Sequence, residues 1–110
     1  MEKNQQILIG QILGAIGTIQ EYIHGLTKTE FVQDRKTQDA VLMQLQFIGE
    51  LSKGLSEEFR NSAADVPWEK IIGLRNVISH EYLGLDINRI WNTVENNLPP
   101  LQAVLEKIFK

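Results

Sequence analysis

The chain has 110 residues, no cysteine and a formal net charge of −3, and 43% of its residues are hydrophobic. This length and composition predict one soluble globular domain, residues 1–110, whose core needs no disulfide or metal. The lack of cysteine excludes thiolate nucleophiles and Cys-ligated zinc and fits a cytoplasmic location, which we expect. The acidic balance and the scattered Lys and Arg residues argue against a general affinity for nucleic acid, so any RNA contact must be local and no DNA binding is expected.

The first predicted helix includes residues 7–19, an apolar run interrupted by one Gln, and ends near Gly25. This run is too short to span a membrane, so no membrane association is expected. Its apolar residues recur at helical spacing, at Ile9, Ile12, Leu13, Ile16, Ile19 and Ile23. Gly10, Gly14 and Gly17 have neither the preceding strand nor the following Gly-Lys-Ser/Thr of a nucleotide-binding loop, so we interpret them as positions of close helix packing.

Residues 27–35 are polar and predict a short helical turn with Thr29 as its cap. From Thr37 to Leu55, apolar side chains cover more than one face, which predicts the most buried helix of the bundle. These side chains are Ala40, Val41, Leu42, Met43, Leu45, Phe47, Ile48, Leu51 and Leu55. Glu50 lies within the run, where it either pairs with a buried base or lies at the helix edge, and its role stays open.

Residues 56–59 resemble a helix start with acidic side chains in the first turn, and they begin a short, lid-like connection. Asp65 and Pro67 then predict the start of a longer helix, because Asp caps helix N-termini and Pro fits the first helical position. Gly84 indicates where this helix ends.

Asp86 predicts the N-cap of a helix over residues 87–97, and Pro99-Pro100 kinks or restarts a last helix that continues to Ile108. Every periodic stretch has the helical period, and no alternating strand pattern or internal repeat occurs. The sequence therefore predicts an all-α, up-and-down bundle of about five helices.

The helix that begins near Pro67 separates its side chains into two sectors. At about 100° per residue, the apolar sector holds Ile71, Leu74, Val77 and Ile78, and the opposite side holds Arg75, Asn76, Ser79 and His80. Arg75 and His80 are about 140° apart around the axis, so they flank a groove over Asn76 and Ser79. Short polar groups of this kind are more typical of a contact surface than of a helix face in open water.

Arg75 and His80 have the chemistry that a metal-free ribonuclease requires. RNA supplies its own nucleophile, the 2′-hydroxyl, so the protein must provide a proton carrier and a cation at the phosphate. An imidazole and a guanidinium are such groups. The alternative is a structural Arg and His that hydrogen-bond Glu81 or the backbone. His24 has no His, Asp or Glu partner at ligand spacing, so no metal site and no cofactor are expected.

The spacing Arg75-x4-His80-x-Tyr82 resembles the Arg-x4-His-x-Tyr motif of the HEPN superfamily, and in particular that of HepT-like toxin ribonucleases. The resemblance covers about residues 5–108. It includes Gln38-Asp39-Ala40, Ile48-Gly49-Glu50, Val66-Pro67-Trp68, Arg75-Asn76 and Val94–Leu98 with Pro99.

This resemblance implies a HEPN-like helical domain that forms a two-fold homodimer, with Arg75 and His80 as catalytic residues in a composite dimer cleft. Because each chain has one such His, a dimer also supplies the two copies that acid and base catalysis need. Asn76 and Ser79 are the candidate substrate-binding residues. The resemblance further implies a toxin of a toxin-antitoxin system, a metal-independent endoribonuclease that a nucleotidyltransferase antitoxin neutralises by adenylylating Tyr82. The alternative function is a non-catalytic helical partner, or nucleotide-binding subunit, of a nucleotidyltransferase, which the acidic net charge favours.

Overall fold

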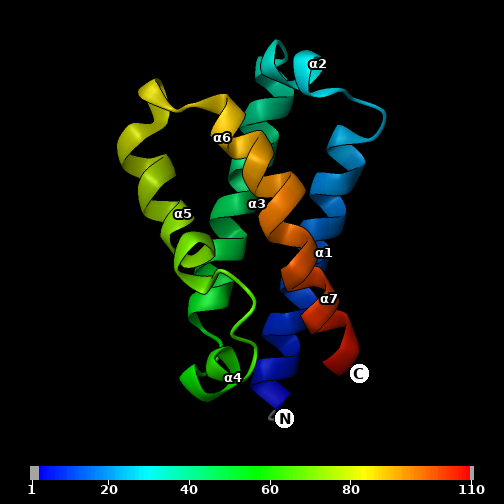
Figure 1. The fold of residues 1–110 in the computed structure, drawn as a ribbon, viewed down its shortest axis with the longest axis vertical. Helices are drawn as coiled ribbons and strands as arrows, with labels where there is room; N and C mark the ends of the chain where they lie inside the picture. Colours follow the sequence, from blue (N-terminus) through cyan, green and yellow to red (C-terminus); the bar gives the residue numbers. More distant parts are fainter. Residues whose placement is uncertain (1–2, 110) are drawn as a thin grey trace.

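The computed structural model describes residues 3–109 as a bundle in which four long helical segments alternate in direction (Figure 1). These segments are α1 (Lys3–Ile23), α3 (Arg35–Lys53), α5 (Trp68–Glu81) and the continuous run of α6 (Ile87–Asn92), the π-helical η2 (Thr93–Asn97) and α7 (Leu98–Ile108). The connections contain α2 (Lys28–Val32), α4 (Glu57–Ser62) and the 3-10 turn η1 (Tyr82–Gly84). No strand occurs between residues 3 and 109, so the predicted all-α, up-and-down fold is confirmed.

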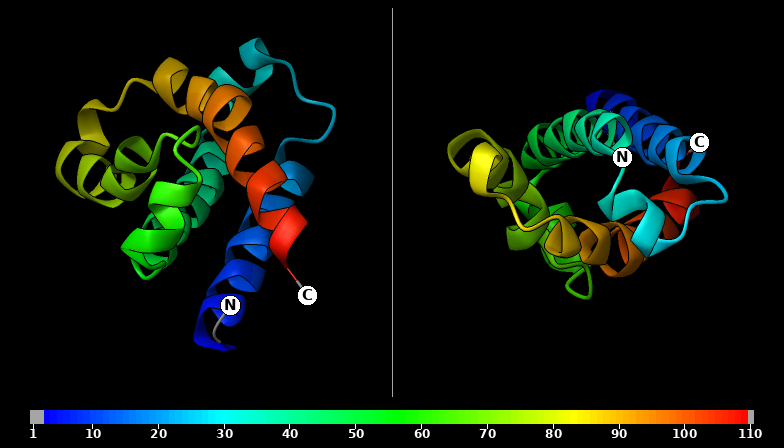
Figure 2. Two further views of the ribbon diagram at one scale, coloured as in Figure 1. Left: turned by 60° about the horizontal axis from the view of Figure 1, so that its bottom comes forward. Right: turned by 90° about the horizontal axis from the view of Figure 1, so that it is seen from above.

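Helix α3 lies in the middle of the packing, because it contacts both α1 and α5 along its length. Helix α7 closes the bundle against α1, and α2 packs on α6, as the view from above shows (Figure 2). The rings of Phe31 in α2 and Trp91 in α6 are 5.1 Å apart between centroids. The fully buried core side chains from the long helices include Ile9, Ile12, Ile19, Val41, Leu45, Ile48, Ile71, Leu101 and Leu105.

Gly49 fixes how closely α3 and α5 approach. A Cβ atom at this position would lie 2.9 Å from the carbonyl oxygen of Ile71, which is closer than real Cβ contacts. The prediction that glycines of the first helix allow close packing is wrong for Gly14 and Gly17, whose added Cβ would meet no atom of residues 3–109 within 4 Å. Gly10 does lie in a contact, beneath the ring of Phe109.

Side-chain caps set most of the helix starts. Asp86 caps α6 as predicted, Ser56 caps α4 at the predicted helix start, and Asp34 caps α3. Thr37 donates its hydroxyl and its backbone N–H to Asp34, which lowers the pKa of that carboxyl below its ordinary value. The cap of α2 is Thr27, in a reciprocal pairing with Glu30, so the prediction of Thr29 is wrong.

The predicted start of α5 needs a similar correction. Pro67 occupies the N-cap position itself, no side chain caps this end, and Asp65 lies two residues before the cap. The indole N–H of Trp68 instead donates to the backbone oxygen of Ala63 at 3.0 Å. The turn before α5 is therefore held by the first residue of the helix and not by a carboxylate.

The predicted disturbance at the two consecutive prolines takes the form of the π-helical stretch η2, directly before α7. Pro99 and Pro100 have no backbone N–H, so they cannot donate to the carbonyl oxygens four residues earlier. The wider π-helical turn accommodates these missing hydrogen bonds, so the helix continues into α7.

Helix α3 is less enclosed than the sequence predicted. Its apolar residues cover more than one face, but Met43 and Phe47 are 53% and 50% exposed. Neither α1 nor α5 covers this outer face of α3. No helix within residues 3–109 is long and apolar enough to cross a membrane.

Candidate active site

The polar residues of the motif share the outer face of α5. Arg75, Asn76, Ser79 and His80 are exposed, whereas Ile71, Leu74 and Ile78 are buried in the core. The helical period places them this way, because burying one sector leaves the opposite sector facing solvent. The structure thus brings the four predicted site residues onto one surface.

Arg75 forms an ion pair with Glu50 across the seam between α5 and α3. Its Nε lies 2.9 Å from Oε1 of Glu50, and both side chains are about half exposed, at 56% and 51%. Glu50 is therefore a carboxylate at a helix edge that pairs with the predicted catalytic cation, and not with a buried base. A guanidinium has five N–H donors, so this contact leaves others for a phosphate. Because the pair is exposed, it contributes only about 0–1 kcal/mol to stability.

His80 lies in the last turn of α5, and its imidazole makes no hydrogen bond or ion pair with another described residue. Its imidazole is thus not occupied by Glu81 or by the backbone, which was the structural alternative. Asn76 lies one turn before it on the same face. A single convex helix face contacts a ligand from one side only, so this surface needs a second wall to surround a phosphate.

Tyr82 begins the 3-10 turn after α5 and reaches back to α3. Its hydroxyl donates to Oδ1 of Asp39 at 2.8 Å and accepts from Nη2 of Arg35 at 2.7 Å. Arg35 also bonds Asp39 through Nε at 3.2 Å, and its Cζ lies 5.3 Å from the centre of the Tyr82 ring. These contacts with Tyr82 and Asp39 raise the pKa of the Arg35 guanidinium. The phenol is therefore held between an acceptor and a cation.

Arg35 and Asp39 were not among the site residues predicted from the sequence. Two signals were available: the i, i+4 spacing of the pair and the Gln38-Asp39-Ala40 segment of the resemblance. Along α3, the exposed Met43 and Phe47 lie between Asp39, which contacts Tyr82, and Glu50, which contacts Arg75. The outer face of α3 is thus an apolar surface, bordered at one end by the contact of Asp39 with Tyr82 and at the other by the ion pair of Glu50 with Arg75.

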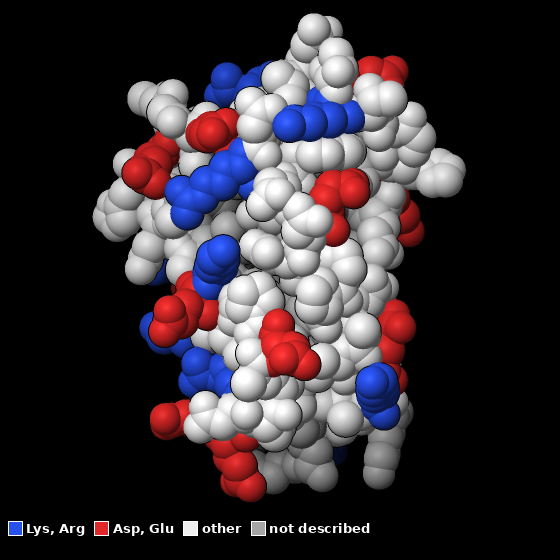
Figure 3. Space-filling model, in the orientation of Figure 1, with Lys and Arg blue, Asp and Glu red and all other residues white. Residues whose placement is uncertain are grey.

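The surface in Figure 3 carries Lys and Arg interspersed with Asp and Glu, and no continuous basic area covers that face. This distribution agrees with the net charge of −3, so on this face a polyanion would meet isolated cations and not a continuous basic surface. Within residues 3–109, no group of three or more His, Cys, Asp or Glu side chains is placed to hold a metal ion.

Comparison with known proteins identifies the family. The family described as ribonuclease HepT-like matches residues 12–108, most of the chain. The chain belongs to the HepT-like ribonuclease family. The resemblance seen in the motif is confirmed, and so is the predicted enzyme class, a ribonuclease.

Several curated relatives of this HepT-like chain carry ribonuclease names. A Thermococcus cleftensis protein named "Probable ribonuclease HepT" is 32% identical over the whole of both chains. A "Putative RNase" of Methanocaldococcus jannaschii is 35% identical, over 99% of this chain and 90% of that protein. Another "Putative RNase", of Caldanaerobacter subterraneus, is 34% identical over 82% of this chain and 80% of its own length. No solved structure matches.

Proposed function

We propose that this HepT-like chain is a metal-independent endoribonuclease, the toxin of a toxin-antitoxin system, and that Arg75 and His80 perform the cleavage. The observation that carries this proposal is the arrangement on α5, where an unengaged imidazole and a guanidinium with open donors share one exposed face. Asn76 and Ser79 lie on the same face and supply short hydrogen-bonding groups for the RNA backbone.

In the proposed reaction, the imidazole of His80 takes the proton of an RNA 2′-hydroxyl. The 2′-oxygen then attacks the adjacent phosphorus, the bond from phosphorus to the 5′-oxygen breaks, and a 2′,3′-cyclic phosphate forms. A second imidazole gives a proton to the leaving 5′-oxygen. Arg75 binds the phosphate oxygens on which negative charge increases in the transition state.

The test of this function is RNA cleavage by the purified chain in the presence of EDTA. We expect cleavage to persist, because no step above uses a metal ion. Products ending in a cyclic phosphate, identified by mass spectrometry, would support attack by the 2′-hydroxyl. Cleavage that stops with EDTA and returns with added metal would contradict the mechanism, and no cleavage at all would favour the non-catalytic partner of a nucleotidyltransferase.

We further propose that the chain acts as a two-fold homodimer whose composite cleft contains both copies of His80. Two observations support this proposal: the motif face of one α5 is convex, and the neighbouring outer face of α3 exposes Met43 and Phe47. Burial of this apolar surface by a second copy would place two motif faces opposite each other and provide the second imidazole.

Phe47→Glu is therefore expected to turn the dimer into a monomer and to abolish cleavage, because a carboxylate would replace an apolar contact. Light scattering at micromolar concentration measures the oligomeric state. Ile7→Glu is the matched control, because Ile7 is a similarly exposed apolar side chain on α1, and it should stay dimeric and active. Cleavage of RNA by a wild-type chain that is monomeric would contradict the proposed composite cleft.

We propose that a nucleotidyltransferase antitoxin switches the enzyme off by adenylylating Tyr82. In this reaction the phenol oxygen attacks the α-phosphate of ATP, the bond to the bridging oxygen of the β-phosphate breaks, and pyrophosphate leaves. The contacts of Tyr82 support the proposal, because Asp39 is placed to take the phenol proton and Arg35 to stabilise negative charge on the oxygen. The added AMP would carry negative charge and bulk about 10 Å from Arg75 along α5, where it would repel and obstruct RNA.

Co-expression with the cognate nucleotidyltransferase is expected to add mass in AMP units to the wild-type chain, and none to Tyr82→Phe. Asp39→Asn should lower the modified fraction, because an amide is a far weaker proton acceptor. Tyr22→Phe is the control, since Tyr22 is the other tyrosine and is also exposed. Mass spectrometry of peptides locates the modification. Added mass on Tyr22, or neutralisation with no added mass, would contradict this switch.

A further inference from the structure

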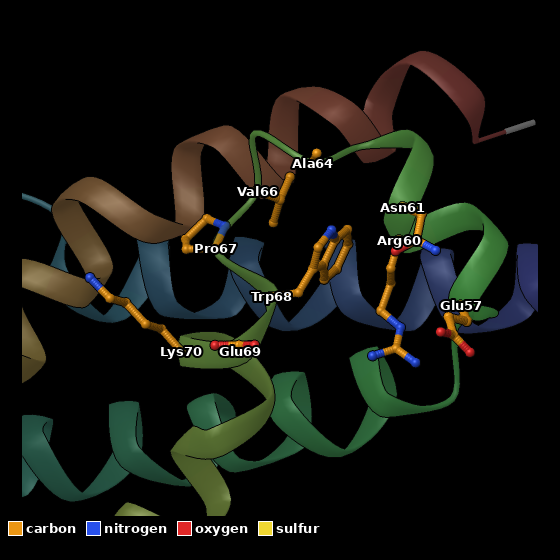
Figure 4. Close-up of a pocket in the computed structure, with 9 residues that line it drawn as sticks. All are labelled: Glu57, Arg60, Asn61, Ala64, Val66, Pro67, Trp68, Glu69 and Lys70. Carbon is orange, nitrogen blue, oxygen red and sulfur yellow. The ribbon is translucent and has the colours of Figure 1, made fainter.

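A cleft of about 570 Å³ opens between α4 and the start of α5, on residues that the proposed cleavage does not use (Figure 4). We call it the Arg60 cleft. Its polar lining includes Glu57, Arg60, Glu69 and Lys70, and Trp68 forms part of its wall. Neither Arg75 nor His80 lines it. Its volume lies within the range of about 300–1,000 Å³ that is usual for small-molecule sites.

Arg60 lines this cleft with a guanidinium that no described protein group engages. Its Nε is buried from solvent and has no hydrogen-bond partner. Glu57 lines the same cleft, yet no ion pair joins Arg60 to a carboxylate within residues 3–109. Buried donors in native proteins are almost always satisfied by a protein group, an ordered water or an ion, so an unpartnered guanidinium leaves hydrogen-bonding capacity that an anion in the cleft can take up.

Trp68 gives the cleft a fixed aromatic wall. Its indole N–H is engaged by the backbone oxygen of Ala63 at 3.0 Å, and its ring meets the edge of Phe59 with centroids 6.0 Å apart. In the view of Figure 4, Trp68 lies between Arg60 on one side and Pro67 with Lys70 on the other. An indole held in this way can stack on a nucleobase with little further loss of side-chain conformational entropy.

The charges in the cleft restrict the ligand. Two cations, Arg60 and Lys70, are matched by two carboxylates, Glu57 and Glu69. A triphosphate would place several negative charges near both carboxylates, whereas one phosphate can bind the guanidinium and leave the carboxylates to accept from hydroxyl or amino groups. This balance favours a ligand with one phosphate and a polar, flat body.

We propose that the Arg60 cleft binds a nucleoside monophosphate unit, with its phosphate on Arg60 and its base against Trp68. Such a unit occurs both as a free mononucleotide and as one residue of an RNA strand, and both share this chemistry. The inference does not depend on RNA cleavage, because it concerns binding at a separate place on the chain.

Titration of the chain with AMP, followed by Trp68 fluorescence in a Trp91→Phe background, tests the proposal. We expect saturable quenching by AMP and at least tenfold weaker binding of adenosine, which has no phosphate. Arg60→Gln should weaken AMP binding at least tenfold, whereas Arg89→Gln, the same change at an exposed residue of α6 outside the cleft, should alter it less than twofold. A hexanucleotide of 2′-O-methyl RNA, which lacks the nucleophile for cleavage, will compete with AMP if the cleft takes a strand and will not if it takes a free mononucleotide.

Two further measurements separate loss of binding from loss of folding. Equilibrium dialysis of AMP against chains that retain Trp91 repeats the comparison without the background change, and Arg60→Lys keeps the charge but has no Nε–H. Arg60→Lys should fold like the wild type in thermal unfolding and still bind AMP more weakly. Equal binding of AMP and adenosine, or wild-type affinity in both Arg60 variants, would overturn the proposal.

Discussion

His80→Ala is expected to lower the rate of RNA cleavage by about 10²–10⁴-fold, the usual contribution of a positioned general acid or base. The imidazole is exposed, has no protein partner among the described residues and lies on the same helix face as Arg75. Its removal leaves the 2′-hydroxyl proton without an acceptor and the 5′-oxygen without a donor. Single-turnover cleavage of a defined RNA measures the effect.

The same substitution should leave the free energy of unfolding nearly unchanged, because surface substitutions away from packing contacts usually alter it by less than about 0.5 kcal/mol. His24→Ala is the matched control, since His24 is the other histidine and is also exposed, near the end of α1. It should keep full activity. Loss of folding in His80→Ala would instead indicate a structural role, and undiminished cleavage would exclude His80 from the reaction.

Arg75→Ala is also expected to lower the rate of RNA cleavage, because it removes the cation at the phosphate. Its cost to stability should stay within about 0–1 kcal/mol, since the pair with Glu50 is half exposed. Glu50→Gln separates the role of Arg75 in the ion pair from its role at the phosphate. It breaks the same ion pair but keeps the guanidinium, so it should retain much more activity than Arg75→Ala.

Gly49→Ala is expected to lower the free energy of unfolding by about 1–3 kcal/mol, the usual cost of adding volume to a packed interior. The added Cβ would meet the carbonyl oxygen of Ile71 at 2.9 Å and that of Ile72 at 3.4 Å. Both atoms belong to the backbone of α5, so relief requires the whole helix to move. Such a shift would also displace the motif face of α5 relative to the outer face of α3, so cleavage should fall in the protein that remains folded.

Gly73→Ala, on the facing helix α5, is expected to have the opposite effect on stability. No described atom lies within 4 Å of a Cβ at Gly73, and the residue lies within α5. Alanine is favoured over glycine inside a helix by about 1 kcal/mol, so this variant should be as stable as the wild type or more so. Urea unfolding of both variants gives the comparison. A Gly49→Ala chain as stable as the Gly73→Ala chain would contradict the close approach of α3 and α5.

The features that depend on local periodicity and on single residues were predicted correctly from the amino-acid order. Helical spacing of apolar side chains predicted the all-α bundle, and the same spacing placed Arg75 and His80 on the exposed side of α5. Asp86 was correctly identified as a cap and residues 56–59 as a helix start, because a cap bonds a backbone N–H only two or three residues away. The motif led to the HepT-like family for a similar reason, since it lies within a few turns of one helix.

The contacts between residues of different helices became known only from the folded chain. No local pattern distinguishes Gly49 from Gly14 as the point of close packing, because a glycine allows close approach only where another backbone is present. In the same way, no local pattern showed that Glu50 pairs with Arg75, that Asp39 and Arg35 hold the Tyr82 hydroxyl, or that Met43 and Phe47 are left exposed. The periodicity of one helix fixes the direction of its own side chains, whereas each of these contacts depends on the position of a second helix, which is set by packing of the whole core.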